Sequence, residues 1–134
     1  MRDIKFRVWD KDSNKIYSQD DFILTFDVVG EDIYLSKNDK IIPLYRYELM
    51  QYTGLKDKNG KEIYEGDIFK NCGGLIKLVV WKDNGFKAKY TFKRRYQGEE
   101  WNEHSFTDLR DTESKRWGVE IIGNIYENKD LLEK

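Results

Sequence analysis

Short segments in which polar and apolar residues alternate, separated by turn-forming residues, run along most of the chain. Ile4, Phe6 and Val8 share one parity in the first such segment, and a period of two is typical of a strand with one buried face. Glycines then recur at positions 54, 60, 66, 73, 74 and 85. Turn signals about every ten residues are the spacing of a small β-barrel or sandwich. The sequence therefore predicts a mostly β fold.

The composition supports this fold class. The 134 residues include one alanine, Ala88, but four Trp, nine Tyr and seven Phe, and aromatic side chains suit a pleated, half-buried surface. These rings can bury enough area to disfavour disorder, although 37% of the residues are charged. The formal net charge of -1 gives no global attraction to nucleic acid, membranes or acidic substrates.

The turn signals divide the chain into two expected parts. We expect a hairpin-rich N-terminal region at residues 1–53 and a small barrel at 54–134, because the turns become more closely spaced after Gly54. Residues 45–52 fit a helix or a strand, and the strand is favoured. Asn59-Gly60 predicts a hairpin turn in which both residues tolerate positive φ. Residues 97–116 are polar and predict a long loop, and Asn128 predicts a cap for a short C-terminal helical turn.

Targeting and redox features point to the cytoplasm. No apolar run approaches the roughly 20 residues of a membrane helix, and no hydrophobic segment follows the charged N-terminus, so neither a membrane span nor a secretory signal is expected. Cys72 is the only cysteine, so the chain has no internal disulfide.

Candidate catalytic and metal-binding residues are few. His104 is the only histidine, and Cys72 beside Gly73-Gly74 has no evident basic partner in sequence, so an ordinary surface histidine and an incidental thiol are favoured. Asp10, Asp12, Asn14 and Asp21 resemble EF-hand ligand positions. Lys15 stands where that loop needs glycine, so a hairpin turn is favoured. We expect no enzyme activity, metal or cofactor; a hydrolase using His104 or a carboxylate metal site is a minor alternative.

Charge is distributed unevenly in the second half of the chain. Residues 77–95 hold seven basic residues against one acid, and residues 97–113 hold six acids against one base. The basic stretch contains aromatic residues and could bind single-stranded nucleic acid. Strand alternation instead predicts Phe86, Ala88, Tyr90 and Phe92 on a core face and lysines on a solvated face. The candidate nucleic-acid contacts are Lys77, Lys82, Lys87, Lys89, Lys93, Arg94 and Arg95.

Three blocks of sequence resemble one protein family. They are Lys5 to Asp10, Leu49 to Ile68, which contains Gln-Tyr-Thr-Gly-Leu-Lys-Asp-Lys-Asn-Gly and Tyr-Glu-Gly-Asp, and Ile122 to Asn128. In these blocks the chain closely resembles the YopX family of phage and prophage proteins. The resemblance implies a β-rich fold with an SH3-type barrel in the later part, an accessory role and self-association. It implies no activity, cofactor or catalytic residue, and residues 70–118 lie outside the three blocks.

The leading hypothesis is a non-catalytic binding or assembly module. Aromatic residues on short strands whose edges need partners motivate it, and tryptophan concentrates binding energy in few side chains. The candidate contacts are Trp9, Trp81, Trp101 and Trp117, with burial of all four in the core as the alternative. The expected partners are a second copy of the chain and an unidentified host or phage protein.

Overall fold

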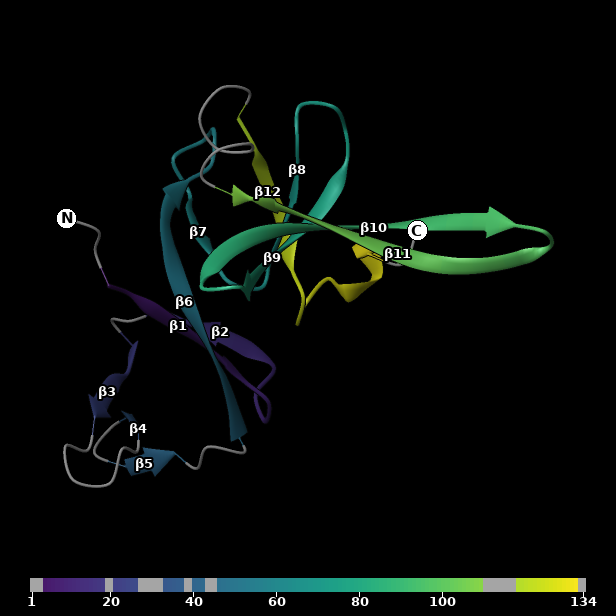
Figure 1. Cartoon of the computed structure of the whole chain (residues 1–134). Coiled ribbons are helices and arrows are strands. Elements are labelled where there is room, and N and C mark those ends of the chain that lie inside the picture. Colours follow the sequence, from purple (N-terminus) through teal and green to yellow (C-terminus); the bar gives the residue numbers. More distant parts are fainter. Residues whose placement is uncertain are drawn as a thin grey trace. The chain divides into compact units, whose positions relative to one another are not determined.

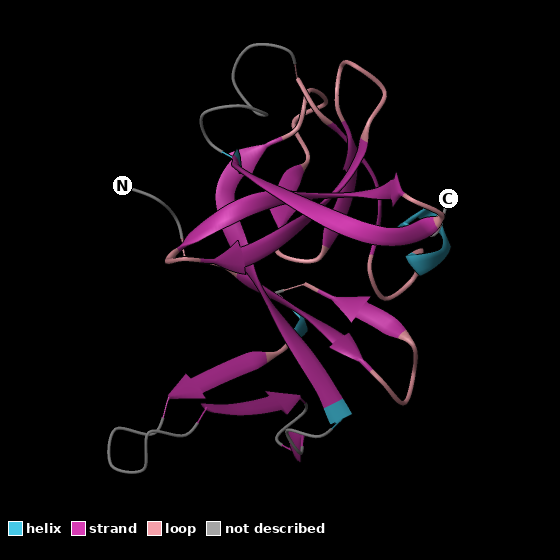
Figure 2. Ribbon diagram, turned by 45° about the vertical axis from the view of Figure 1, so that its right-hand side comes forward, coloured by secondary structure: helices cyan, strands magenta, loops and turns pink. Residues whose placement is uncertain are grey.

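The chain is built mainly of antiparallel strands. The computed structural model describes residues 4–18, 21–26, 33–37, 40–42, 46–109 and 118–132. Strands dominate this part, and a 3-10 turn, η3, lies at Lys129–Leu132 (Figure 1, Figure 2). The predicted mostly β fold and C-terminal helical turn are confirmed. No helix in these ranges is long and apolar enough to cross a membrane.

Contacts divide the chain into two compact units, Met1–Tyr52 and Thr53–Lys134. The first unit contains β1 (Phe6–Asp10), β2 (Lys15–Tyr17), β3 (Ile23–Phe26), β4 (Ile33–Lys37), β5 (Lys40–Ile42) and the start of β6 (Tyr47–Lys56). Strand β1 pairs with both β2 and β6, and β3, β4 and β5 form a separate meander. The predicted strand at 45–52 is thus confirmed from Tyr47 onward. The core of this unit centres on Val8, Phe22 and Tyr47.

The second unit contains the end of β6, β7 (Glu62–Tyr64), β8 (Asp67–Lys70), β9 (Ile76–Lys82), β10 (Gly85–Tyr96), β11 (Glu99–Asp108) and β12 (Glu120–Asn124). β7 is the neighbour of β6, and the other five strands form a sheet in the order β11-β10-β9-β8-β12. Four strands follow one another as a meander, and the fifth returns to pair with the first. This is the strand connectivity of an SH3-type barrel.

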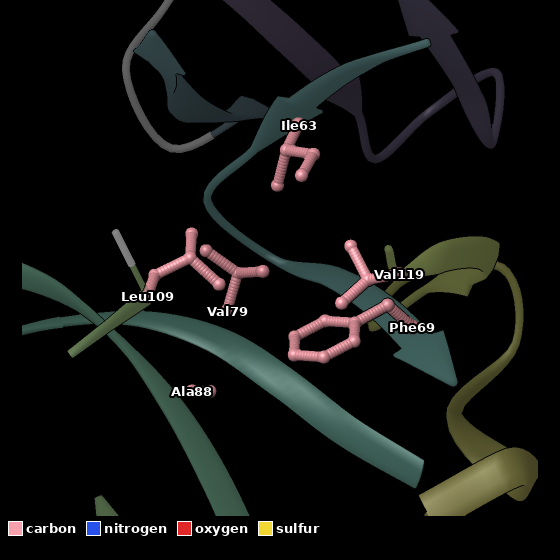
Figure 3. Close-up of a cluster of buried hydrophobic side chains, with 6 residues drawn as sticks. All are labelled: Ile63, Phe69, Val79, Ala88, Leu109 and Val119. Atoms are coloured by element: carbon pink, nitrogen blue, oxygen red, sulfur yellow. The ribbon is translucent and has the colours of Figure 1, made fainter. Parts of the chain in front are cut away.

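A compact apolar cluster holds the second unit together. Its buried side chains come from β7, β8, β9, β10 and the two chain segments next to β11 and β12 (Figure 3). Burial of each large apolar side chain contributes roughly 1.5–3 kcal/mol. The members are Ile63, Phe69, Val79, Ala88, Leu109 and Val119.

The prediction of a long loop at 97–116 is wrong for Glu99–Asp108, which forms β11. Every residue of β11 pairs with a residue of β10, from Tyr96↔Glu99 to Lys87↔Asp108. The segment lacks a clear apolar alternation because most of its side chains stay exposed on both faces. Acidic residues opposite a basic strand stabilise the pairing instead, and that signal is not local in the sequence.

The turn at Asn59-Gly60 joins β6 and β7, as the sequence predicted, but in a different form. Only Gly60 has a positive φ, of 82°. The Asp57 N–H donates to the Lys61 carbonyl at 2.8 Å, and the Gly60 N–H donates to Asp57 at 3.0 Å. The hairpin therefore has three loop residues, with glycine in the left-handed position.

Candidate functional site

Strands β10 and β11 form a two-stranded ribbon that continues past the rest of their sheet. Residues Gly85 to Lys89 of β10 pair with β9, whereas Tyr90 to Tyr96 pair only with β11 (Figure 1). We call Tyr90–Tyr96 and Glu99–Ser105 the ribbon. Its tip is the turn Gln97-Gly98, where φ is 51° and 82°. Positive φ at both turn residues is typical of a type I′ turn, whose twist matches that of the flanking strands.

One face of the ribbon carries aromatic side chains. Ala88, on this face, is buried in the core, and strand alternation places Tyr90, Phe92, Arg94 and Tyr96 on the same side. The cross-strand partner of Arg94 is Trp101, so its side chain also lies there. We call Tyr90, Phe92, Tyr96 and Trp101 the aromatic face. It is an extension of the core face of the sheet beyond the core itself.

Specific contacts order the aromatic face. The rings of Tyr90 and Phe92 stack at 5.7 Å between centroids and 21° between planes, and the Arg94 guanidinium lies 5.3 Å from the Phe92 centroid. The Glu103 carboxylate accepts hydrogen bonds from Arg94 Nε and from Trp101 Nε1, both at 3.1 Å. Tyr96 is nevertheless 67% exposed and Trp101 41% exposed. The face is thus ordered but open to solvent.

The opposite, outer face of the ribbon carries three charged side chains, Lys93, Arg95 and Glu100. Glu100 Oε2 accepts a hydrogen bond from Arg95 Nε at 2.8 Å, and Glu100 Oε1 lies 3.1 Å from Lys93 Nζ. Hydrogen bonding and charge from Lys93, with a hydrogen bond from Arg95, lower the pKa of the Glu100 carboxyl. Thr91 Oγ1 and His104 Nδ1 are 2.8 Å apart on the same face. The later part of the basic stretch lies on β10, and the described part of the acidic stretch lies mainly on β11, so the two charge types meet in one hairpin.

The seven candidate nucleic-acid contacts do not form one basic surface. Lys77 is buried on β9, and Lys82 lies 3.8 Å from the centroid of the Phe106 ring. Arg94 lies on the aromatic face, whereas Lys89 is half-buried on the outer face. The remaining contacts, Lys87, Lys93 and Arg95, lie on the outer face in ion pairs with Asp108, Glu100 and Glu100. Cations that already contact a carboxylate release fewer counterions from phosphates, which weakens the electrostatic case for nucleic acid.

The four candidate tryptophans have different surroundings. Trp9 is half-buried on β1. Trp81 is 50% exposed and packs edge-on against Phe86, with centroids 4.8 Å apart. Trp101 belongs to the aromatic face, and Trp117 lies outside the described residues. The rest of the aromatic face, Tyr90, Phe92 and Tyr96, was not among the sequence candidates, because alternation alone indicated core positions.

A hollow of about 260 Å³ lies at the base of the ribbon, where β9 and β10 part. Ile76 and Leu78 of β9, and Leu131 and Leu132 of η3, are among its apolar lining residues, and Lys89 and Thr91 line it beside the ribbon. Leu78 and Lys89 are cross-strand partners. Their shared face is opposite the one carrying Val79 and Ala88, so the hollow is on the outer face of the sheet.

The acidic loop at Asp10 is a hairpin turn, as the sequence favoured. Asp10 Oδ1 accepts hydrogen bonds from the Asp12 N–H at 3.0 Å and from Arg46 Nε at 3.2 Å. Burial opposes ionisation of Asp10, but the bond from Arg46 and the others outweigh it and lower its pKa. Arg46 also pairs with Asp12 at 3.2 Å. Within the described ranges, no group of three or more His, Cys, Asp or Glu residues is arranged to hold a metal ion.

The motif residues in the middle of the chain have structural roles. Asp57 accepts three backbone hydrogen bonds, from Asn59, Lys61 and Ile121, at 2.9, 2.8 and 3.1 Å. Burial opposes ionisation of Asp57, but these bonds outweigh it and lower its pKa. Asp67 likewise accepts a hydrogen bond from the Tyr64 N–H at 2.8 Å. Both carboxylates hold turns, and Asp57 also joins β12 to the β6–β7 hairpin.

Comparison with known proteins finds a matching family model and a similar crystal structure. A family model described as YopX protein matches residues 5–133. The crystal structure of protein EF1440 from Enterococcus faecalis is similar, with 28% sequence identity and a TM-score of 0.50, covering 98% of this chain and 99% of that one. No curated protein matches the sequence.

Proposed function

This chain belongs to the YopX family, and from that premise we propose that it is a phage or prophage accessory protein that acts in the bacterial cytoplasm as a non-catalytic binding or assembly module. The aromatic face of the ribbon is its contact surface for a protein partner. The partners we propose are a second copy of this chain and a host or phage protein.

One observation carries this proposal. The face that is buried at Ala88 continues onto the ribbon, where Tyr96 and Trp101 are 67% and 41% exposed. Tyrosine, tryptophan and arginine dominate the energetics of protein interfaces because each buries a large area at a small entropic cost. The bridge from Glu103 to Arg94 and Trp101 reduces the ordering cost of binding.

The ribbon also explains why a partner would stabilise the protein. A two-stranded ribbon that no third strand supports is marginally stable in water. Tyr90 to Tyr96 have β11 as their strand partner, and β11 is the edge of its sheet. A partner covering the aromatic face would remove that area from water at about 25 cal/mol per Å² before the costs of association.

The double variant Tyr96→Ala/Trp101→Ala tests the proposal. We expect it to lose concentration-dependent self-association in sedimentation velocity, and to lose a partner that the wild-type protein retains from infected or lysogenic cells. Asn102→Ala is the matched control, because Asn102 is exposed next to Trp101 but on the outer face. Equal behaviour of the double variant and the wild type, with both folded by circular dichroism, would refute the role of the aromatic face.

A further inference from the structure

The ribbon has an open backbone edge on the β10 side. The two-residue turn Gln97-Gly98 makes Tyr96 and Glu99 a hydrogen-bonded pair, and such pairs alternate along an antiparallel ladder. Thr91, Lys93 and Arg95 therefore direct their N–H and C=O groups away from β11. In the described part of the chain these groups face no neighbouring strand, because pairing with β9 ends at Lys89↔Leu78.

The two faces beside this edge differ in chemistry. Lys89, Lys93 and Arg95 lie along β10 on the outer face, and one carboxylate, Glu100, serves both Lys93 and Arg95. None of the described acids forms an ion pair with Lys89. On the other side, Phe92 and Tyr90 offer apolar contacts. An added strand would therefore meet excess positive charge on one face and rings on the other.

The hollow lies at the inner end of the same edge. Thr91, the first open position of β10, lines it together with the apolar side chains of Leu75, Leu131 and Leu132. A residue opposite Thr91 would carry its side chain on the outer face, as Thr91 does. An apolar side chain there would reach the hollow.

We infer that the β10 edge of the ribbon binds an extended segment of a partner protein by strand addition. The segment runs antiparallel to β10, with acidic residues opposite Arg95 and Lys93, an apolar residue opposite Phe92 and another beside the hollow at Thr91. Backbone hydrogen bonds to Thr91, Lys93 and Arg95 give affinity, and the alternate side chains give specificity, as in other cases of strand addition. From its N-terminal end, the residue pattern of the segment is thus acidic, any residue, acidic, apolar, apolar.

This inference rests on the proposed function only in treating the ribbon as the binding element. The probe is the peptide acetyl-Glu-Val-Glu-Val-Leu-amide, bearing a fluorophore at its N-terminal end, titrated with the full chain. We expect saturable binding by fluorescence anisotropy. The variant Lys93→Glu should weaken it about tenfold or more, because a like charge then opposes the acid. Lys15→Glu, an exposed change on β2, should leave it unchanged.

Backbone methylation separates strand addition from charge attraction. Methylating the nitrogen of the second glutamate, opposite Lys93, removes an N–H that points at β10 and should abolish binding. Methylating the first valine, whose N–H points away, should preserve it. Equal binding of the two methylated peptides, or of a lysine-containing peptide, would overturn the inference.

Competition distinguishes the possible occupants of the edge. If a second copy of the chain occupied it, peptide binding would fall as protein concentration rose, and that result would overturn the inference. Absence of peptide binding together with loss of partner capture in Tyr96→Ala/Trp101→Ala would also overturn it, while leaving the aromatic face as the contact surface. If the peptide bound the Leu132→Ala variant as tightly as the wild type, the hollow would be excluded as part of the binding site.

Discussion

Replacing Asp57 by asparagine tests how the second unit is held together. The carboxylate joins the β6–β7 turn to β12 by accepting backbone hydrogen bonds from Asn59, Lys61 and Ile121. In the variant, the remaining oxygen can keep the bonds from Asn59 and Lys61. The new amide group, however, would face the Ile121 N–H, so one donor loses its acceptor and meets another donor.

The structure sets the size of the effect. A hydrogen bond to a charged group contributes about 1.5–3 kcal/mol, and the variant loses one such bond, so we expect a loss of about 2 kcal/mol in the free energy of unfolding. For a unit of this size, that loss lowers the melting temperature by roughly 8–16 °C. Urea unfolding followed by circular dichroism at pH 7 measures it. Asp83→Asn, at an exposed turn position with φ of 52° that asparagine tolerates, should stay within about 0.5 kcal/mol.

The same variant has a defined pH dependence. The pKa of Asp57 is lowered in the folded chain, so its contribution is fully present above the unfolded value of about 3.9 and is lost as the pH falls through the folded value. The gap between wild type and Asp57→Asn should be constant from about pH 7 to 5 and shrink below about pH 4. A loss equal to that of Asp83→Asn, or a gap that does not change with pH, would refute the role assigned to Asp57.

Two further predictions follow from the fold and the ribbon. Gly123→Ala should destabilise the second unit by about 1–3 kcal/mol, because a Cβ there would clash with the Asn128 side chain. Gly73→Ala is the control in the same urea assay, because a Cβ at Gly73 would meet its nearest atom at 3.4 Å. Equal losses of stability in the two variants would contradict the clash. Binding to oligothymidine should show a shallow salt dependence, with a slope of log K against log salt weaker than about -2, because Lys87, Lys93, Arg94 and Arg95 already contact carboxylates. A slope near -5, as expected for seven engaged cations, would restore nucleic acid as the ligand.

Patterns within short stretches of sequence predicted those strands and turns that depend on neighbouring residues alone. Alternation placed β1 and the first part of β10, and turn residues placed the hairpin ends, because strand parity and positive φ depend on a few neighbouring residues. At Asp83-Asn84 both φ values are positive, 52° and 61°, as the turn chemistry requires. The family blocks were also recognisable in the sequence, because motifs such as Gln-Tyr-Thr-Gly and Tyr-Glu-Gly-Asp are continuous along the chain.

Features that depend on distant residues could not be predicted from the sequence. β11 is a strand because β10 lies beside it, and its own residues read as a polar loop. The Asp57 to Ile121 hydrogen bond spans 64 positions. Exposure of Tyr96 and Trp101 likewise follows from where β9 stops pairing with β10, whereas alternation alone indicates that ring-bearing faces are core. The cross-strand ion pairs could have been suggested by the adjacent basic and acidic stretches.

Amide hydrogen exchange of the ribbon, with and without the partner retained from host cells, tests most directly whether this element is the contact surface. We expect exchange at residues 90–105 to be fast in the free protein, because the ribbon lacks a third strand, and to slow on binding, with little change in β1, β2 and the β6–β7 hairpin. Unchanged exchange in the ribbon, with new protection elsewhere in the chain, would contradict the proposal.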